Sequence, residues 1–251
     1  MSDLHSFELA ATDGKLIRGD RAMGKDRQIL FITGFLSKRW GNKSKALAQW
    51  CQEQGWGFCC YDVRGFGDSE GTFTDYSLSD WVADARSVLT LLKDGPPTTI
   101  VGNSLGGWIA WLIAQEFEFV DRLILIAPAF NMMGVRATQI APERRQAWQN
   151  TGWMPWDDDP LHKDWALSWK WVEESEAYWQ TTFDRLRPVQ TTILHGLQDT
   201  VILPDGSREF ARLLLAKVPT YPIDLNLIPG DHRLSSPEHV ERFHRLVLGQ
   251  S

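Results

Sequence analysis

The sequence predicts a protein of the α/β class, in which a doubly wound, mostly parallel sheet is covered by helices on both faces. Short apolar runs rich in β-branched residues alternate with segments of helical period, and the alternation occurs twice along the chain. The first expected strands cover residues 28–33, 58–62, 98–102 and 122–127, and the helices between them cover residues 45–54, 79–92 and 106–116. Because helical crossovers join parallel strands, we expect one open sheet with its site at the carboxyl ends of the strands.

A second set of alternating elements follows near the end of the chain. Its expected strands cover residues 191–196 and 224–229, and its helices cover residues 205–217 and 237–248. Near the start, residues 7–18 alternate between apolar and polar around Asp13-Gly14, which predicts a short hairpin leading into the sheet.

The segment between the two sets, residues 129–187, differs in character and is expected to be a helical lid inserted after the sixth core strand. It has no buried-strand pattern, and a turn is expected at residues 157–160. Seven of the 13 tryptophans lie here: Trp148, Trp153, Trp156, Trp165, Trp169, Trp171 and Trp179. The predicted organisation is therefore a core in two parts, residues 1–128 and 188–251, with a Trp-rich lid between them.

Composition argues against several classes of function and location. The net charge of −6 comes from 32 acidic and 26 basic side chains without a basic stripe, so we expect no nucleic-acid partner. No apolar run reaches the length of a membrane span, and the first residues lack the pattern of a signal peptide. Three cysteines, two of them adjacent, are poor material for disulfides, so we expect a protein of the reducing cytoplasm.

A serine between two glycines is the strongest chemical signal in the chain. The motif Gly102-x-Ser104-x-Gly106 stands between an expected strand and an expected helix, which is the setting of a nucleophile elbow. A sharp turn of this kind strains the serine backbone, and side chains at the two glycine positions would collide with the neighbouring strand and helix. We therefore expect Ser104 to be a nucleophile.

A serine nucleophile needs a histidine base, and the histidine needs a carboxylate to orient it. In elbow-containing sheets these partners follow the serine in the order Asp, His. Asp199 comes just after the expected strand 191–196, and His232 follows the next strand by a similar distance. The predicted catalytic triad is Ser104, Asp199 and His232.

The other histidines fit the role of the base less well. His239 and His244 lie on the expected last helix, where exposure to solvent is the ordinary state. His5 and His162 precede the second set of strands. His195 ends a strand, so we expect a buried side chain that supports the site rather than the base itself.

Two other acids are alternatives to Asp199. Asp231 is adjacent to His232, and a neighbour in sequence rarely points back at the ring beside it. Asp205 is expected to be the N-cap of a helix.

The backbone amides of Leu105 and Phe35 are the expected oxyanion hole. Leu105 follows the nucleophile at a helix N-terminus, and Phe35 lies in the loop after the first core strand. Lys38 and Arg39 follow in the same loop. Their charges meet either an anionic part of a substrate or only solvent.

Five stretches together resemble the α/β-hydrolase superfamily. They are Thr33-Gly34-Phe35, the segment 61–69 (YDVRGFGDS), the elbow 102–106, the segment 196–199 (GLQD) and Gly230-Asp231-His232. A narrower set is similar to the mitochondrial palmitoyl-protein thioesterase branch and its bacterial relatives: residues 34–37 (GFLS), 45–47 (KAL), 104–108 (SLGGW) and 231–233 (DHR).

The resemblance implies cleavage of acyl thioesters and related esters through a serine acyl-enzyme, with no cofactor and no metal. Its implied partners are a small-molecule ester or acyl thioester, or an acylated protein, and we expect a monomer or homodimer. The chain departs from the common pattern at Thr33, where relatives often have histidine, and at Asn103, often histidine or serine. Both changes leave the backbone donors intact, whereas the lid need not match that of any relative.

The lid tryptophans have two interpretations. They form either the core of a small helical subdomain or, for some of them, an apolar channel for an acyl chain above Ser104. The residues that we assign to the channel are Trp148, Trp153, Trp156 and Trp169.

Fold and triad do not by themselves determine the reaction. A carbon–carbon bond hydrolase or lyase could use the same triad, and a non-catalytic ligand-binding protein could keep the fold. Dehalogenases and epoxide hydrolases need an aspartate at the elbow, so Ser104 argues against both.

Overall fold

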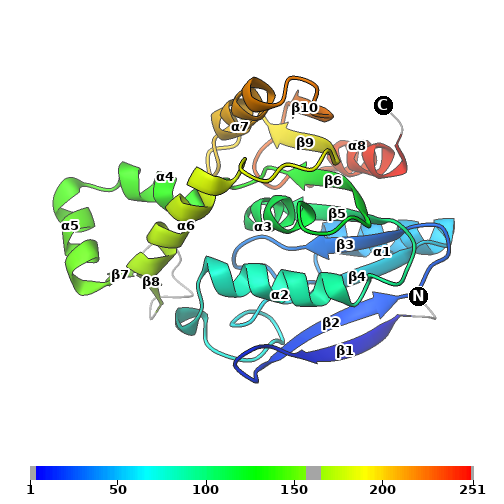
Figure 1. Ribbon diagram of the computed structural model, residues 1–251, viewed down its shortest axis with the longest axis horizontal. Helices are drawn as coiled ribbons and strands as arrows, with labels where there is room; N and C mark the ends of the chain where they lie inside the picture. The colour runs from blue at the N-terminus through cyan, green and yellow to red at the C-terminus, as the bar shows by residue number, and fades with distance from the viewer. Residues whose placement is uncertain (1–3, 157–164, 250–251) are drawn as a thin grey trace.

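The computed structural model describes residues 4–156 and 165–249. Within these ranges a central eight-stranded sheet has the order β1-β2-β4-β3-β5-β6-β9-β10 (Figure 1). Its strands are β1 (His5–Ala10), β2 (Leu16–Ala22), β3 (Gln28–Ile32), β4 (Gly57–Tyr61), β5 (Thr98–Asn103), β6 (Val120–Ile126), β9 (Gln190–Gly196) and β10 (Ile223–Ile228). From β4 to β10 all neighbours are parallel, whereas β1 and β2 join antiparallel. The predicted α/β class with a mostly parallel sheet is confirmed.

The N-terminal hairpin is longer than the sequence predicted. β1 pairs with β2 through the expected turn, where the amide of Gly14 donates to the carbonyl of Ala11 at 3.0 Å. β2 continues to Ala22 because its other edge pairs with β4, from Gly19 opposite Tyr61 to Ala22 opposite Phe58. That second pairing is a tertiary contact, which the local alternation of residues does not reveal.

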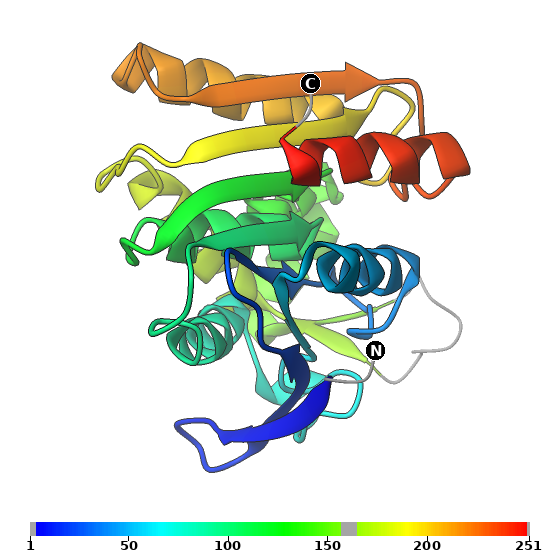
Figure 2. The same ribbon diagram turned by 90° about the vertical axis from the view of Figure 1, so that its right-hand side faces the viewer.

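Helices cover both faces of the sheet (Figure 2). One face packs against α1 (Asn42–Gln54) and α8 (Pro237–Leu248), and the other packs against α2 (Leu78–Thr90), α3 (Leu105–Ala114) and α7 (Pro204–Lys217). Along β3, Ile29 and Phe31 belong to the core beneath α1, while Leu30 and Ile32 belong to the opposite core. This alternation buries every residue of the strand, as the continuous apolar run predicted.

The expectation that Asp205 caps α7 is wrong. The N-cap is Leu203, and Pro204 occupies the first helical position, which its fixed φ angle suits. Asp205 therefore lies in the first turn, where its carboxylate pairs with Arg208.

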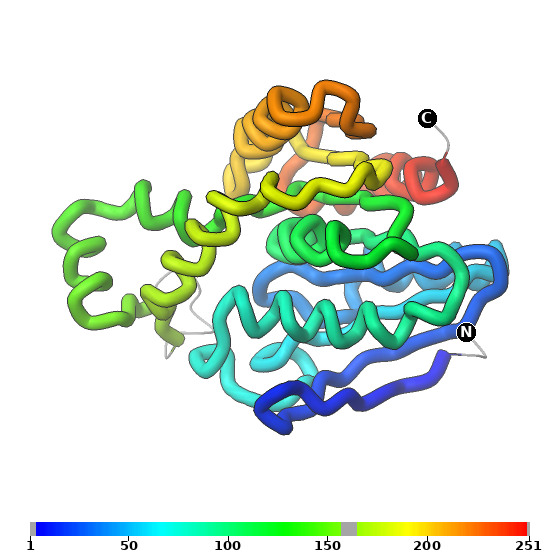
Figure 3. Tube along the Cα trace, in the orientation of Figure 1, coloured from blue at the N-terminus to red at the C-terminus, as the bar shows by residue number. Residues whose placement is uncertain are grey.

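Between β6 and β9 the chain leaves the core and returns to it (Figure 3). This excursion contains α4 (Met132–Gln139), α5 (Pro142–Thr151), β7 (Trp153–Pro155), β8 (Ala166–Ser168) and α6 (Trp169–Thr181). The two short strands pair antiparallel and bury Met154 and Leu167, although the sequence predicted no strands here. Three residues are too few for an alternating pattern to show. The turn expected at residues 157–160 and His162 lie outside the described residues.

The segment 129–187, called the lid below, is attached to the core through α6. The Glu174 carboxylate accepts hydrogen bonds from the Ser77 hydroxyl at 3.0 Å and from the Ser79 amide at 2.9 Å, at the start of α2. Trp171 packs edge-on against Trp81 with ring centroids 4.9 Å apart. These contacts hold α6 beside the carboxyl edge of the sheet, where the site lies.

The three cysteines are free and buried. Burial raises the pKa of the Cys51 and Cys59 thiols to about 12. They therefore behave as small apolar groups. None of the helices in the described part of the chain combines the length and apolar character that a membrane span requires.

Candidate active site

Ser104 stands at a strained turn between β5 and α3. Its φ and ψ angles are 54° and −121°, in a region that non-glycine residues rarely adopt. A Cβ atom added at Gly102 would lie 2.3 Å from the carbonyl oxygen of Gly106, and one added at Gly106 would lie 2.3 Å from the carbonyl oxygen of Thr33. The two glycines are therefore needed for the close approach of strand, turn and helix, as the motif predicted.

Backbone hydrogen bonds hold the elbow in place. The amide of Ser104 donates to the carbonyl of Ile126 at 2.8 Å, and the amide of Ala129 donates to the carbonyl of Ser104 at 3.0 Å. Only 7% of Ser104 is exposed. The position of the nucleophile is thus set by the sheet and by the first residues of the lid.

The loops after β9 and β10 are fastened to each other. The amide of Leu197 donates to the carbonyl of Ile228 at 2.7 Å, and the amide of Gln198 donates to the carbonyl of Gly230 at 2.9 Å. A Cβ atom on Gly196 would lie 2.4 Å from that same Gly230 oxygen, so the loops approach closely only because residue 196 is glycine. This contact brings the residues that follow each strand side by side.

The structure brings the three predicted triad residues together. His232 Nε2 lies 3.1 Å from Ser104 Oγ, and His232 Nδ1 lies 2.7 Å from Asp199 Oδ2. A carboxylate only accepts, so Nδ1–H donates to Asp199 and Nε2 accepts the serine hydroxyl. In this tautomer the imidazole can take the serine proton as the hydroxyl attacks.

Asp199 is held as a carboxylate. Its Oδ1 accepts the amides of Val201 and Ile202, both at 2.9 Å, and its Oδ2 accepts from His232 and from His195 Nε2, the latter at 3.1 Å. Burial alone would raise the pKa of Asp199, but these donors outweigh it and hold the pKa well below the usual range. The orienting acid is therefore ionised at neutral pH.

His195 contacts the Asp199 carboxylate from the interior of the protein. It is fully buried, and its Nε2 lies within hydrogen-bond distance of two acceptors, Asp199 Oδ2 and the carbonyl oxygen of Ile202 at 2.9 Å. Nε2 must therefore carry a proton, which leaves Nδ1 to accept from the Ser207 hydroxyl at 2.8 Å. The expectation of a buried supporting histidine is confirmed.

Asp231, the alternative acid, accepts from backbone amides, while Asp199 holds the His232 imidazole. Its Oδ1 accepts the amides of Arg233 and Leu234, both at 3.0 Å, and so closes the turn that follows β10. This use of its carboxylate agrees with the argument that a sequence neighbour does not orient His232.

The two predicted oxyanion donors come from two segments that adjoin the serine. A Cβ atom on Gly34 would lie 3.1 Å from Ser104 Cβ, which places the peptide before Phe35 directly beside the nucleophile. Leu105 opens α3. Within the described ranges neither the Phe35 nor the Leu105 amide donates a hydrogen bond to the protein, so both are free for a substrate oxygen.

Aromatic rings surround Phe35 on the side of the lid. Its ring centroid lies 5.4 Å from that of Trp156, 5.2 Å from Trp171 and 5.5 Å from Phe73. We call these four residues the aromatic flank. Through them, the loop that carries one oxyanion donor is packed directly against the lid.

The four tryptophans assigned to a substrate channel have different surroundings. Trp156 belongs to the aromatic flank. Trp148 is 1% exposed, donates its Nε1–H to the carbonyl of Leu167 at 2.8 Å and packs edge-on against Trp169, so both contribute to the interior of the lid. Trp153 is 45% exposed. Of the four, the structure places Trp156 beside the oxyanion loop.

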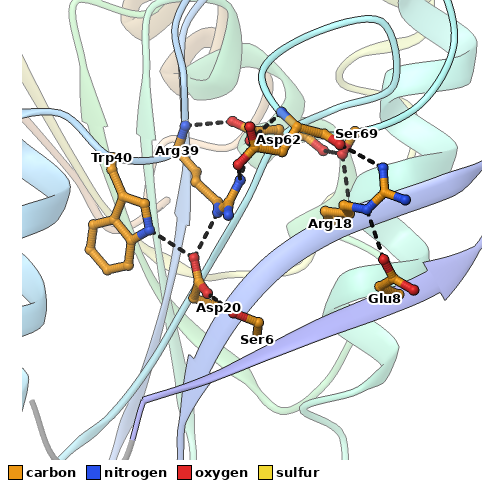
Figure 4. Close-up of polar contacts among 9 residues, drawn as sticks. Ser6, Glu8, Arg18, Asp20, Arg39, Trp40, Asp62 and Ser69 are labelled. Atoms are coloured by element: carbon orange, nitrogen blue, oxygen red, sulfur yellow. Dashed lines mark hydrogen bonds and ion pairs between the residues drawn. The ribbon is translucent and has the colours of Figure 1, made fainter.

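Arg39 neither contacts a substrate site nor stands free in solvent. Its guanidinium pairs with three carboxylates: Asp20 at 2.7 Å, Asp62 at 2.5 Å and Asp68 at 2.7 Å (Figure 4). Trp40 Nε1 also donates to Asp20, at 2.7 Å. This cluster ties the end of the oxyanion loop to β2 and to the loop after β4. The sequence analysis missed it because its members are brought together only by strand order.

A cavity of about 470 Å³ opens beside the triad; of the aromatic flank, Phe35 lines it and the other three residues do not. Ser104 and His232 contribute to its wall, together with the oxyanion loop, the first turn of α1 and the loop after β10. Among the described residues, no group of His, Cys, Asp and Glu side chains could hold a metal ion. The arrangement therefore places a hydroxyl, an imidazole and two backbone amides beside a space that a small molecule can enter.

Comparisons with known proteins place the chain among hydrolases. The sequence matches the α/β hydrolase family over residues 29–249. It is 28% identical over 197 residues to the Rattus norvegicus protein named palmitoyl-protein thioesterase ABHD10, mitochondrial; the match covers 72% of this chain and 62% of that protein. The chain thus spans less than two thirds of the length of that relative.

Solved structures show the same fold. The α/β hydrolase domain-containing protein 10 from mouse has a TM-score of 0.83 at 22% identity, and the match covers 98% of this chain and 97% of that one. A putative hydrolase from Agrobacterium vitis S4 also has a TM-score of 0.83, at 23% identity, with 98% of each chain covered.

Proposed function

Because the chain belongs to the α/β hydrolase family, we propose that it is a serine hydrolase that cleaves carboxylic esters or thioesters with an apolar acyl group. One observation carries the proposal: the distances of 3.1 Å from Ser104 Oγ to His232 Nε2 and of 2.7 Å from His232 Nδ1 to Asp199. A hydroxyl, an imidazole and an ionised carboxylate in this order make a nucleophile with its base.

The geometry supports a two-step reaction. Ser104 Oγ attacks the acyl carbonyl while His232 Nε2 accepts its proton, and Asp199 stabilises the imidazolium that forms. The tetrahedral intermediate collapses when His232 returns the proton to the departing alcohol or thiol, which leaves an acyl-enzyme. Water, activated by the same imidazole, then releases the acid and restores the serine.

The amides of Phe35 and Leu105 would stabilise the oxyanion of both intermediates. Backbone donors that are already in place need no reorganisation during the reaction, and loss of one such donor costs about 10²–10³ in rate in other serine hydrolases. Thr33 and Asn103, where this chain departs from the common pattern, leave this part of the mechanism unchanged, because the donors are backbone groups.

The aromatic flank supports the assignment of an apolar acyl group. Phe35 lines the cavity beside Ser104 and packs against Trp156, and each methylene buried on this apolar surface would contribute about 0.8 kcal/mol. The rat relative's name, palmitoyl-protein thioesterase, points to the same class of substrate. Both a small-molecule thioester and an acylated protein fit this proposal.

The test is covalent labelling followed by turnover. A fluorophosphonate probe should label the wild-type protein at Ser104 and should not label Ser104→Ala. With p-nitrophenyl esters, a burst equal to the amount of enzyme would show the acyl-enzyme and would argue against a carbon–carbon hydrolase or lyase. Undiminished labelling of Ser104→Ala would reject the nucleophile, and absence of both labelling and turnover in the wild type would favour a non-catalytic ligand-binding protein.

We also propose a cytoplasmic location. Its support is the state of the cysteines, which are free and buried. Fractionation of cells that produce the protein at native level tests it, and recovery in another compartment would reject it.

A further inference from the structure

The cavity beside Ser104 is lined by positive charge. Three basic side chains contribute to its wall, Lys38 from the oxyanion loop, Lys43 from the first turn of α1 and Arg233 from the loop after β10. None of the described residues that line it is acidic. The protein as a whole carries a net charge of −6, so the sign of this cavity is opposite to that of the molecule. We call Lys38, Lys43 and Arg233 the basic flank.

Lys43 is fixed at the base of this flank. Its ammonium group donates a hydrogen bond to the carbonyl oxygen of Arg233, the residue next to His232. An ammonium has three protons, so two remain after this bond. The pKa of Lys43 is lowered to about 8, chiefly by burial, with the nearby Asp231 opposing the shift and Arg233 adding to it. A buried ammonium group is poorly solvated, so a bound anion stabilises it more than it would stabilise an exposed ammonium group.

The position of the flank relative to His232 tells which part of a substrate it meets. The general acid must lie beside the leaving group, because it returns a proton to the departing atom. Arg233 follows His232 directly, and both line the cavity, whereas the flank residues Trp156, Trp171 and Phe73 do not and pack around the far side of Phe35. The acyl chain and the leaving group therefore meet surfaces of opposite chemistry.

We propose that the cavity is a leaving-group subsite for an anion, so that the preferred substrates are esters or thioesters whose alcohol or thiol carries a carboxylate or a phosphate. This inference rests on the proposed function and narrows its substrate class. Carboxylate and phosphate share the oxygens that ammonium and guanidinium groups bind, and hydrogen bonds between charged groups are about twice as strong as neutral ones.

The experiment compares pairs of thioesters that differ in leaving-group charge alone. One pair is the octanoyl thioester of 3-mercaptopropionate and that of its methyl ester. The other is octanoyl-4′-phosphopantetheine and octanoyl-pantetheine, which tests a phosphate-bearing leaving group as the first pair tests a carboxylate-bearing one. For the wild type we expect kcat/KM of an anionic member to exceed that of its neutral partner by about tenfold, as one charged hydrogen bond would provide. This ratio should fall as salt is added, because ions screen the attraction.

Three variants test the residues. Lys43→Gln and Arg233→Gln should each bring the ratio close to one, and Lys38→Gln, whose side chain is exposed, should lower it less. Lys45→Gln is the matched control, because it removes the same charge from the same helix at an exposed position outside the cavity wall. The neutral substrate measures in every variant whether the enzyme is folded and active, and Lys38→Gln provides the answer if Lys43→Gln does not fold.

The outcomes separate this inference from the proposed function. If the wild type cleaves neutral thioesters and labels at Ser104 but shows a ratio near one, the anionic subsite is wrong and the hydrolase proposal stands. A wild-type ratio that survives in Lys43→Gln, Arg233→Gln and Lys38→Gln alike also overturns the subsite. If the wild type neither labels nor cleaves any thioester, both proposals fall.

Discussion

The two flanks of Ser104 differ in chemistry and in how they are built. The aromatic flank is a set of rings from the oxyanion loop, the segment after β4 and the lid, held by packing among themselves. The basic flank stands on the first turn of α1 and on two loops, and its side chains face an open cavity. The packed rings exclude water from the space between them. The charged groups around the cavity can bind a ligand that enters it.

Between the flanks, backbone contacts hold the triad. Backbone hydrogen bonds and glycine contacts place Ser104, Asp199 and His232, and none of these contacts involves a lid tryptophan or a lysine. The difference teaches that reaction and substrate choice are carried by separable parts of the molecule. Substitutions at the centre should therefore affect all substrates alike, and substitutions on one flank should affect one half of the substrate.

The largest effect is expected from Ser104→Ala. Without the nucleophile, kcat should fall by at least about 10⁴-fold for every acyl chain and every leaving group. Thermal unfolding serves as the control, because loss of one hydroxyl at this site should leave the fold intact. Residual activity of Ser104→Ala that still depended on the leaving group would contradict the proposal that Ser104 is the nucleophile for every substrate.

The elbow glycines provide the next test. A Cβ atom at Gly106 would lie 2.3 Å from the carbonyl oxygens of both Ile32 and Thr33, so Gly106→Ala should destabilise the protein by about 1–3 kcal/mol and displace Ser104. Urea denaturation measures the change in the free energy of unfolding. Gly206→Ala is the matched control, because a Cβ atom there meets nothing within 4 Å and alanine favours the helix. Equal stability of the two variants would contradict the steric account of the elbow.

His195 tests the support of the centre. Asparagine retains an amide near Nδ1 and glutamine retains a donor near Nε2, so His195→Asn loses the bond to Asp199 that His195→Gln can keep. We expect His195→Asn to lower kcat by about tenfold at unchanged KM, and His195→Gln to recover part of the loss. A purely structural role would lower the stability of both variants without this difference in kcat. Both effects should be the same for anionic and neutral leaving groups.

On the aromatic flank, Trp156→Ala should weaken the dependence of kcat/KM on acyl-chain length. With p-nitrophenyl esters of about two to about twelve carbons, the wild-type values should rise with chain length, because each buried methylene contributes about 0.8 kcal/mol. Trp153 allows a comparison within the lid, since Trp153→Ala removes the same group at a position that is 45% exposed and does not contact Phe35. If the wild-type kcat/KM did not depend on chain length, the acyl channel would be rejected. If Trp156→Ala and Trp153→Ala changed this dependence equally, the role of Trp156 in binding the acyl chain would be rejected.

The smallest effect is expected from pH on the basic flank. The pKa of Lys43 lies at about 8, so its ammonium is charged below that pH and neutral above it. The preference for anionic over neutral leaving groups should therefore fall severalfold between about pH 7 and about pH 9. Arg233 and Asp231 are the charged groups that face Lys43, and an arginine keeps its proton over this range. In Lys43→Gln this ratio should not change with pH.

Much of the centre could be predicted because local sequence carries its constraints. The glycines around Ser104 mark a close approach of backbones, and Asp199 and His232 each follow a strand whose apolar run is evident. The sequence analysis expected Asp205 to cap α7, whereas the helix begins at Pro204. It also missed the two strands of the lid, because strands of three residues give little periodic signal.

By itself, the sequence determined which residues can do chemistry and which end of the sheet holds them, since strand period, glycine spacing and the chain order of serine, acid and base are local properties. Only the tertiary structure decided what surrounds them. It joined Arg39 to three carboxylates, placed Trp156 against Phe35 and brought Lys43 beneath Arg233. These contacts link segments far apart in the chain, and packing and strand order, rather than local pattern, determine which of them meet.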